Sequence, residues 1–120
     1  MRHKYGYNKL HKPTDQRIAM LKSLAVAVFR CNRVETTEAR AKELRKMVDG
    51  IITLVKKGDL SGRRRVISLL LGDKELVKQI YAGKERFSKR SSGYSRIIQV
   101  GQRRGDAAKM VWFELVDAAV

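Results

Sequence analysis

The sequence predicts a single α+β domain with four helices, three short strands and a basic N-terminal arm. Hydrophobic periodicity of the helical kind recurs four times between residues 14 and 83, bounded by capping residues and glycines. Two segments near the C-terminal end instead alternate between apolar and polar residues, as strands do. With 120 residues, 43% of them hydrophobic, the chain is long enough for one domain with a core.

The first predicted helix runs from Asp15 to about Arg30. Pro13 closes the arm that precedes it, and Thr14 offers a side-chain cap. Because this segment is apolar nearly all round, we expect it in the middle of the core. Cys31 follows the apolar run, and we expect it to be a buried small hydrophobe, not a reactive thiol.

A short strand is predicted at Val34–Thr36, followed by a second helix from Glu38 to Lys57. Thr37 would cap this helix, and Gly58 would end it. Glu38 and Lys42 stand four residues apart in the order that stabilises a helix. The acids of this helix are therefore interpreted as partners for nearby lysines and arginines.

A third helix is predicted from Gly62 to Leu71 and a fourth from Lys74 to Ala82. Gly72 ends the third helix, Asp73 caps the fourth, and Gly83 ends it. The combination of an apolar stripe with these boundary residues supports four separate helices.

Residues 84–93 are interpreted as a basic connector, followed by strands at Tyr94–Val100 and Met110–Val116. A long basic hairpin loop would join the two strands. The apolar positions of these elements supply the predicted core, which comprises Leu21, Leu24, Val28, Leu44, Val48, Ile51, Phe113 and Leu115.

The formal net charge is +15, and much of the positive charge lies in stretches without hydrophobic periodicity. Such stretches cannot bury enough apolar surface to order themselves, and they favour a polyanion, most commonly a nucleic acid. The arm, residues 1–13, contains no acid and mixes cations with aromatic rings that can stack on bases. Its candidate RNA-binding residues are Arg2, His3, Lys4, Lys9 and Lys12.

Two further groups of arginines are candidates for binding phosphate. Arg63, Arg64 and Arg65 open the third predicted helix, where cations oppose the helix dipole unless an external anion reverses the sign. Arg103 and Arg104 lie in the predicted hairpin loop, where they would enter an RNA surface. The alternatives are a solvated helix face for the first group and an ordinary hairpin turn for the second.

Several classes of function are disfavoured by the residues. Both histidines lie in the arm, and the sequence shows no Ser/His/Asp set and no cluster of residues with metal-ligand spacing. We therefore expect no enzymatic activity, no metal site and no cofactor. One cysteine excludes an internal disulfide. No segment has the apolar length of a membrane span, and the start lacks the apolar region of a signal peptide, so we expect a cytosolic protein without a small-molecule substrate.

Several sequence segments, in this order and spacing, resemble one known family across nearly the whole chain. They are MRHK at the start, Arg17-Ile18-Ala19, Thr36-Thr37, Ala41-Lys42-Glu43-Leu44-Arg45, Ile52-Thr53-Leu54, Lys56-Lys57-Gly58, Gly93-Tyr94-Ser95-Arg96-Ile97, Arg103-Arg104-Gly105-Asp106-Ala107-Ala108 and Glu114-Leu115-Val116. The chain is similar here to the family of bacterial large-subunit ribosomal protein seventeen.

The resemblance implies the element order α-β-α-α-α-β-β, with the helices packed on a small sheet. It implies a structural protein bound to large-subunit rRNA near the outer mouth of the peptide exit tunnel, with neighbouring ribosomal proteins as further partners. Further rRNA-binding candidates on this basis are Arg17, Lys42, Arg45, Arg90, Tyr94 and Arg96. For Tyr94, stacking on RNA and packing in the core both remain open.

Two rival functions are weighed against rRNA binding. In the first, the third and fourth predicted helices imitate a helix-turn-helix of a nucleoid-type or regulatory DNA-binding protein. The spread of charge over arm, helix start and hairpin disfavours it. In the second, the basic helix 38–57 lies on a membrane surface. Its apolar face lacks Trp and Phe, and the core needs that face.

Overall fold

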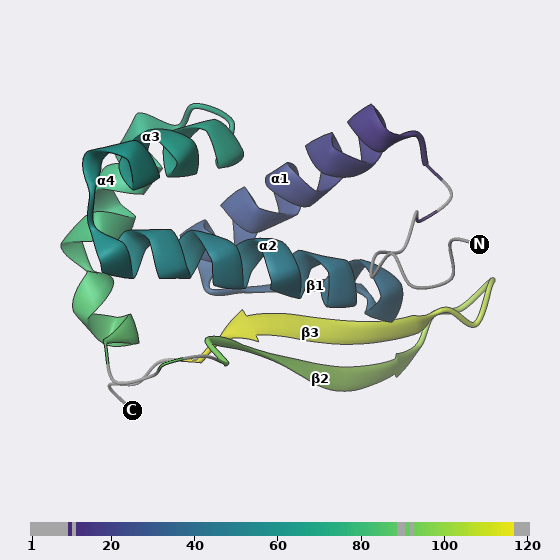
Figure 1. Ribbon diagram of the computed structural model, residues 1–120. Helices are drawn as coiled ribbons and strands as arrows, with labels where there is room; N and C mark the ends of the chain where they lie inside the picture. Colours follow the sequence, from purple (N-terminus) through teal and green to yellow (C-terminus); the bar gives the residue numbers. More distant parts are fainter. Residues whose placement is uncertain (1–9, 11, 89–90, 92, 117–120) are drawn as a thin grey trace, which may run out of the picture.

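The computed structural model describes residues 10, 12–88, 91 and 93–116, which form an α+β domain (Figure 1). The elements are α1 (Thr14–Cys31), β1 (Arg33–Thr37), α2 (Glu38–Lys57), α3 (Leu60–Leu69), α4 (Lys74–Ala82), the short 3-10 helix η1 (Lys84–Phe87), β2 (Ser95–Gln102) and β3 (Lys109–Leu115). The predicted fold class and element order are confirmed. The predicted arm, residues 1–13, lies largely outside the described residues.

The three strands form one antiparallel sheet in the order β1-β3-β2. β3 is central, so a strand from the first third of the chain pairs with one near its end. Phe113 of β3 stands between Val34 of β1 and Ile97 of β2. The helices cover one face of the sheet and leave the opposite face open (Figure 1). Phe113 is fully buried and therefore belongs to the covered face.

The centre of the core is α2, and the prediction that the first helix would occupy it is wrong. α2 buries six apolar residues completely, between the sheet on one side and α1 and α3 on the other. α1 buries one face only, and Ile18 on its other side is 40% exposed. The N-terminal half of α1 diverges from α2 (Figure 1), so its apolar residues there have less of the domain to pack against.

The expected core set is otherwise confirmed, since Leu24 is partly buried and the other seven residues are buried. The expectation for Cys31 is wrong, because this residue is exposed. Cys31 is the last residue of α1, and the inward positions of that last turn are taken by Val28 and Phe29.

The start of α3 differs from the prediction and has a clear cause. The helix begins at Leu60, because Asp59 accepts a hydrogen bond from the backbone N–H of Gly62 at 2.8 Å and acts as its N-cap. A β-carbon on Gly62 would lie 2.5 Å from the Asp59 carboxylate, so a larger residue there would displace the carboxylate from its present position. Asp73 caps α4 in the predicted manner, with its carboxylate accepting from Leu76 N–H at 3.1 Å.

The N-caps of the first two helices form no side-chain hydrogen bonds. Pro13, not Thr14, occupies the N-cap position of α1. Thr37 occupies the predicted position before α2, but its hydroxyl does not bond the helix. The ends of the helices agree better, because Gly58 closes α2 with a left-handed φ of 75° that glycine adopts without strain.

The segment interpreted as a connector holds part of the core. Phe87, at the end of η1, is only 2% exposed. Its ring meets that of Tyr94 edge to face, with 6.1 Å between centroids. Tyr94 is itself 3% exposed and directly precedes β2. This aromatic pair anchors the passage from the helices to the hairpin.

Replacing Phe87 with alanine tests this anchor. We expect Phe87→Ala to lower the free energy of unfolding by about 3–5 kcal/mol, because it removes a buried ring and leaves a cavity. Urea unfolding followed by circular dichroism measures the loss. Lys84→Ala, an exposed substitution in the same short helix, is the control and is expected to stay within about 0.5 kcal/mol of the parent. A loss below about 1 kcal/mol for Phe87→Ala would contradict the anchoring role.

Candidate RNA-binding surface

More than half of the cations of the described residues have partners, and the exposed ones without any gather at two ends of the molecule. Six ion pairs and four contacts of a cation over an aromatic ring occupy much of the positive charge. Among the described residues, the exposed lysines and arginines with no ion pair, hydrogen bond or ring contact are Arg64, Arg65, Lys74, Lys78, Lys84, Arg104 and Lys109.

The first five form the helix end, which comprises Arg64 and Arg65 of α3, Lys74 and Lys78 of α4, and Lys84 of η1. Sequence reasoning missed the three lysines. A signal was present, because Lys74 and Lys78 stand four residues apart on one helix, where like charges repel. A structural role does not explain that spacing, whereas a bound polyanion would offset the repulsion.

Arg63 has a different environment from its two neighbours. Its guanidinium lies over the ring of Tyr81, 4.8 Å from the centroid, and so joins α3 to α4. Burial raises the pKa of the Tyr81 hydroxyl, while the positive charge of Arg63 opposes that rise. Arg63 therefore contributes to helix packing in addition to the charge of this end.

The phosphate site predicted at the start of α3 shares this helix end with a carboxylate of the protein. The prediction combined the arginines with the backbone N–H groups of the helix start. The carboxylate of Asp59 already accepts from Gly62 N–H, and its other oxygen lies 3.7 Å from Lys57 Nζ. The helix therefore carries its own anion at its N-terminus. Any phosphate at this end would be held by the side chains of Arg64 and Arg65.

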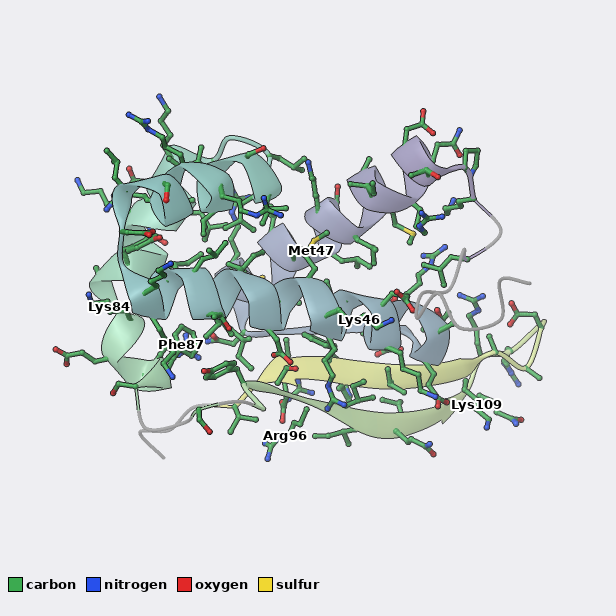
Figure 2. The ribbon with its side chains drawn as sticks, viewed as in Figure 1. Lys46, Met47, Lys84, Phe87, Arg96 and Lys109 are labelled. Carbon is green, nitrogen blue, oxygen red and sulfur yellow. The ribbon has the colours of Figure 1, made fainter. Side chains whose placement is uncertain are left out.

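The hairpin end consists of Arg104 and Lys109, at the tip and the base of the loop between β2 and β3. The loop is folded upon itself. Arg103 N–H donates to the Ala108 carbonyl at 2.8 Å, and the Arg103 guanidinium contacts Asp106 at 2.6 Å. Arg103 thus holds the loop while Arg104 remains exposed without a partner. Figure 2 shows Lys109 and Lys84 at opposite ends of the domain.

The candidates on α2 and α1 have protein partners. Lys42 pairs with Glu38 at 3.1 Å, as the spacing predicted, and Lys46 pairs with Glu43. The Arg45 guanidinium lies 3.5 Å from the Ser95 carbonyl. Arg17 is half-buried on α1, and Lys12 is half-buried before it.

Asp49, the third acid of α2 interpreted as a partner for a cation, forms no ion pair. Burial raises its pKa, the charge of Arg45 lowers it less, and Oδ1 of Asp49 has no hydrogen-bond partner among the described residues.

Tyr94 packs in the core, which resolves the two alternatives for this residue. Its hydroxyl donates to the Ser91 carbonyl at 3.0 Å, and Lys56 Nζ donates to the hydroxyl at 2.9 Å. With a ring only 3% exposed, it offers no free face for a base. Arg96 is exposed on the sheet and pairs with Glu114 across the strands. The candidates Arg2, His3, Lys4, Lys9 and Arg90 lie outside the described residues.

The interpretation of helix 38–57 as a membrane-surface helix finds no support in this geometry. The apolar face of α2, required for a membrane-surface helix, is buried in the core. Across the part of the chain that the structure describes, no helix has the length and apolar character to cross a membrane. In the same residues, no three His, Cys, Asp or Glu side chains are grouped so as to hold a metal ion.

The ion pair in the hairpin loop predicts a measurable titration. The Arg103 side chain and the Ala108 N–H, both bonded to Asp106, lower the pKa of that carboxyl to about 2. Because the folded-state pKa lies below the ordinary value of 3.8, the stabilisation is present above about pH 4 and is lost as the pH falls towards 2. NMR titration of the carboxyl carbon should show this, and Arg103→Ala should move the pKa back towards 3.8. An unchanged pKa in that variant would contradict the pairing.

Comparison with known proteins identifies the family of this chain. The family model described as Ribosomal protein L17 matches residues 20–116. A large ribosomal subunit protein bL17 of Clostridium perfringens is 45% identical over 112 residues, which cover 92% of this chain and 98% of that protein. The bL17 protein of Clostridium botulinum is 44% identical over 111 residues, with the same coverage. The chain therefore belongs to the ribosomal protein L17 family.

Proposed function

We propose that this chain, a structural protein of the large ribosomal subunit, binds large-subunit rRNA through its helix end and its hairpin end. The observation that carries this proposal is the distribution of unpartnered cations. In a chain with a net charge of +15, the described acids pair with cations in the middle of the domain and leave exposed cations without partners at both ends.

The proposed mechanism is charge neutralisation combined with shape. Lysines and arginines bind phosphates without reading the sequence, and each phosphate contact releases counterions. The rigid core fixes the distance between the two basic ends, within a domain whose longest extent is 42 Å. Two RNA segments bound at these ends would be held at a set separation, which would stabilise a folded junction. The arm residues Arg2, His3, Lys4 and Lys9, with Arg90, would add contacts.

The position within the subunit is also part of the proposal. The family resemblance supports a site near the outer mouth of the peptide exit tunnel, with other ribosomal proteins as neighbours, on ribosomes in the cytoplasm. Such a protein has no need of a catalytic set, a cofactor or a small-molecule substrate. Sedimentation of a tagged copy through a high-salt wash tests whether the chain is a stable part of the large subunit. Migration with the nucleoid would favour the DNA-binding rival.

The salt dependence of binding tests the electrostatic mechanism. If about six to ten phosphates are neutralised, the affinity for transcribed large-subunit rRNA should fall by ~10³ or more between 50 and 200 mM salt. Fluorescence anisotropy with labelled protein at several salt concentrations gives the slope. A flat response would contradict the mechanism, and equal or tighter binding to duplex DNA would favour the rival.

Paired substitutions test the two ends separately. Arg64→Ala with Arg65→Ala, and Arg104→Ala with Lys109→Ala, should each weaken rRNA binding and reduce the magnitude of the salt slope by about 1.4–1.8, since each lost phosphate contact removes about 0.7–0.9. Neither pair should change the unfolding midpoint, because these side chains have no partners. The control is Lys42→Ala with Lys46→Ala, which removes two cations that are already ion-paired. Equal losses in the control would show that only net charge matters, and not the two ends.

A further inference from the structure

The face of the sheet turned away from the helices has a composition unlike the rest of the protein. Strand alternation places on it the residues that do not share the side of Phe113. We call this the open sheet face, and it comprises Arg33, Glu35, Thr37, Arg96, Ile98, Met110, Trp112 and Glu114. Val100 adjoins it at a β-bulge, where the alternation of β2 is interrupted. Across the strands, Trp112 stands between Glu35 and Ile98, and Glu114 stands between Arg33 and Arg96. Figure 2 shows Arg96 on the side of the sheet away from the helices.

The open sheet face carries no net charge, although the chain carries +15. Its two arginines are balanced by two glutamates. The Arg96 side chain donates to the Glu114 carboxylate. The guanidinium of Arg33 lies 3.9 Å from the centroid of the Trp112 ring. Both cations therefore have partners within the face, and neither resembles the unpartnered cations of the two basic ends.

Three of the remaining side chains of this face are large and apolar, and they are accessible. Ile98 is 43% exposed, and Trp112 and Met110 are half-buried. Val100, at the adjoining bulge, is 48% exposed. Exposed branched residues beside a tryptophan cost free energy in water unless a partner covers them. Tryptophan, methionine and arginine are also the residues enriched at the centres of protein–protein interfaces.

We propose that the open sheet face docks another protein of the large subunit, through a patch of that protein that is itself apolar and without net charge. The inference rests on the proposed function, since it places the chain in the assembled subunit. The charge of the face favours a protein over RNA, because phosphates would find no free cation here and would lie next to Glu35 and Glu114. Arg33 already covers one side of the Trp112 ring, where a base would otherwise stack.

A cross-linking experiment on assembled large subunits tests this occupant. A photo-reactive benzophenone amino acid replaces Ile98 in a tagged copy, and a second copy carries it in place of Arg104 as the control for RNA contact. After irradiation of purified large subunits, the Ile98 probe should give an adduct that resists ribonuclease and is digested by protease. Mass spectrometry should map it to an apolar, uncharged patch of one other ribosomal protein.

Three other outcomes would overturn the proposal. The probe at position 98 could cross-link to rRNA, it could cross-link to a second copy of this chain, or it could give no adduct while the Arg104 probe reacts. If neither tagged copy enters the large subunit, the proposed function fails together with the docking proposal. If both copies enter it and only the cross-link differs from expectation, the docking proposal alone fails.

Charge substitutions of both signs give an independent test. Ile98→Lys and Ile98→Glu should both reduce retention in large subunits during a high-salt wash, and by similar factors, since either charge would be buried without a partner against an apolar patch. Contact with RNA would instead leave the lysine variant bound as well as the parent and weaken only the glutamate variant. Gln99→Lys and Gln99→Glu, at an exposed neighbour on the other side of the strand, are the matched controls and should be retained like the parent. Equal unfolding midpoints of the free proteins would show that the fold is intact.

Discussion

The packing of α2 against one face of the sheet is the interaction on which the rest of the structure depends. α2 is the only described helix with six buried residues, and it contacts α1, α3, η1 and all three strands. On the sheet side it meets Val111 and Phe113 of the central strand, both fully buried. α2 is the middle of the helical layer, so the positions of α1 and α3 depend on it. β3 is the middle of the sheet, so the position of the hairpin depends on it. The contact between α2 and β3 therefore fixes all of these elements.

A scarcity of acids shapes the surface around that core. The chain has 12 acidic residues against 27 lysines and arginines. Several described acids have definite structural tasks: Asp59 and Asp73 cap helices, Asp106 holds the hairpin loop, and Glu38 and Glu43 pair along α2. The acids thus support the fold where helices start and chains turn. The cations beyond their reach remain unpartnered at the two ends, where a polyanion would offset their mutual repulsion.

The molecule consequently has surfaces of two kinds. The helix end and the hairpin end are basic, polar and separated by the length of the domain. The open sheet face between them is neutral and partly apolar, with its arginines held by Glu114 and Trp112. A protein that occupies a junction in a ribonucleoprotein needs both kinds, because RNA is bound by charge and a protein neighbour by apolar fit. The sheet would serve both proposed contacts, since it carries the hairpin at one end and presents the face along its length.

The sequence by itself determined the element order, most helix ends and the expectation of a polyanionic partner. Those signals are local: the periodicity of 38–57, the glycine at Gly58 and the cap at Asp73 act within a turn or two of the chain. The tertiary structure decided everything that depends on contacts between distant segments. It paired β1 with β3, buried Phe87 and Tyr94, and left Ile18 and Cys31 exposed. The local sequence around an apolar residue does not specify which distant residue will pack against it. The sequence around a cation likewise does not specify whether a distant acid will pair with it. These outcomes therefore required the packed fold.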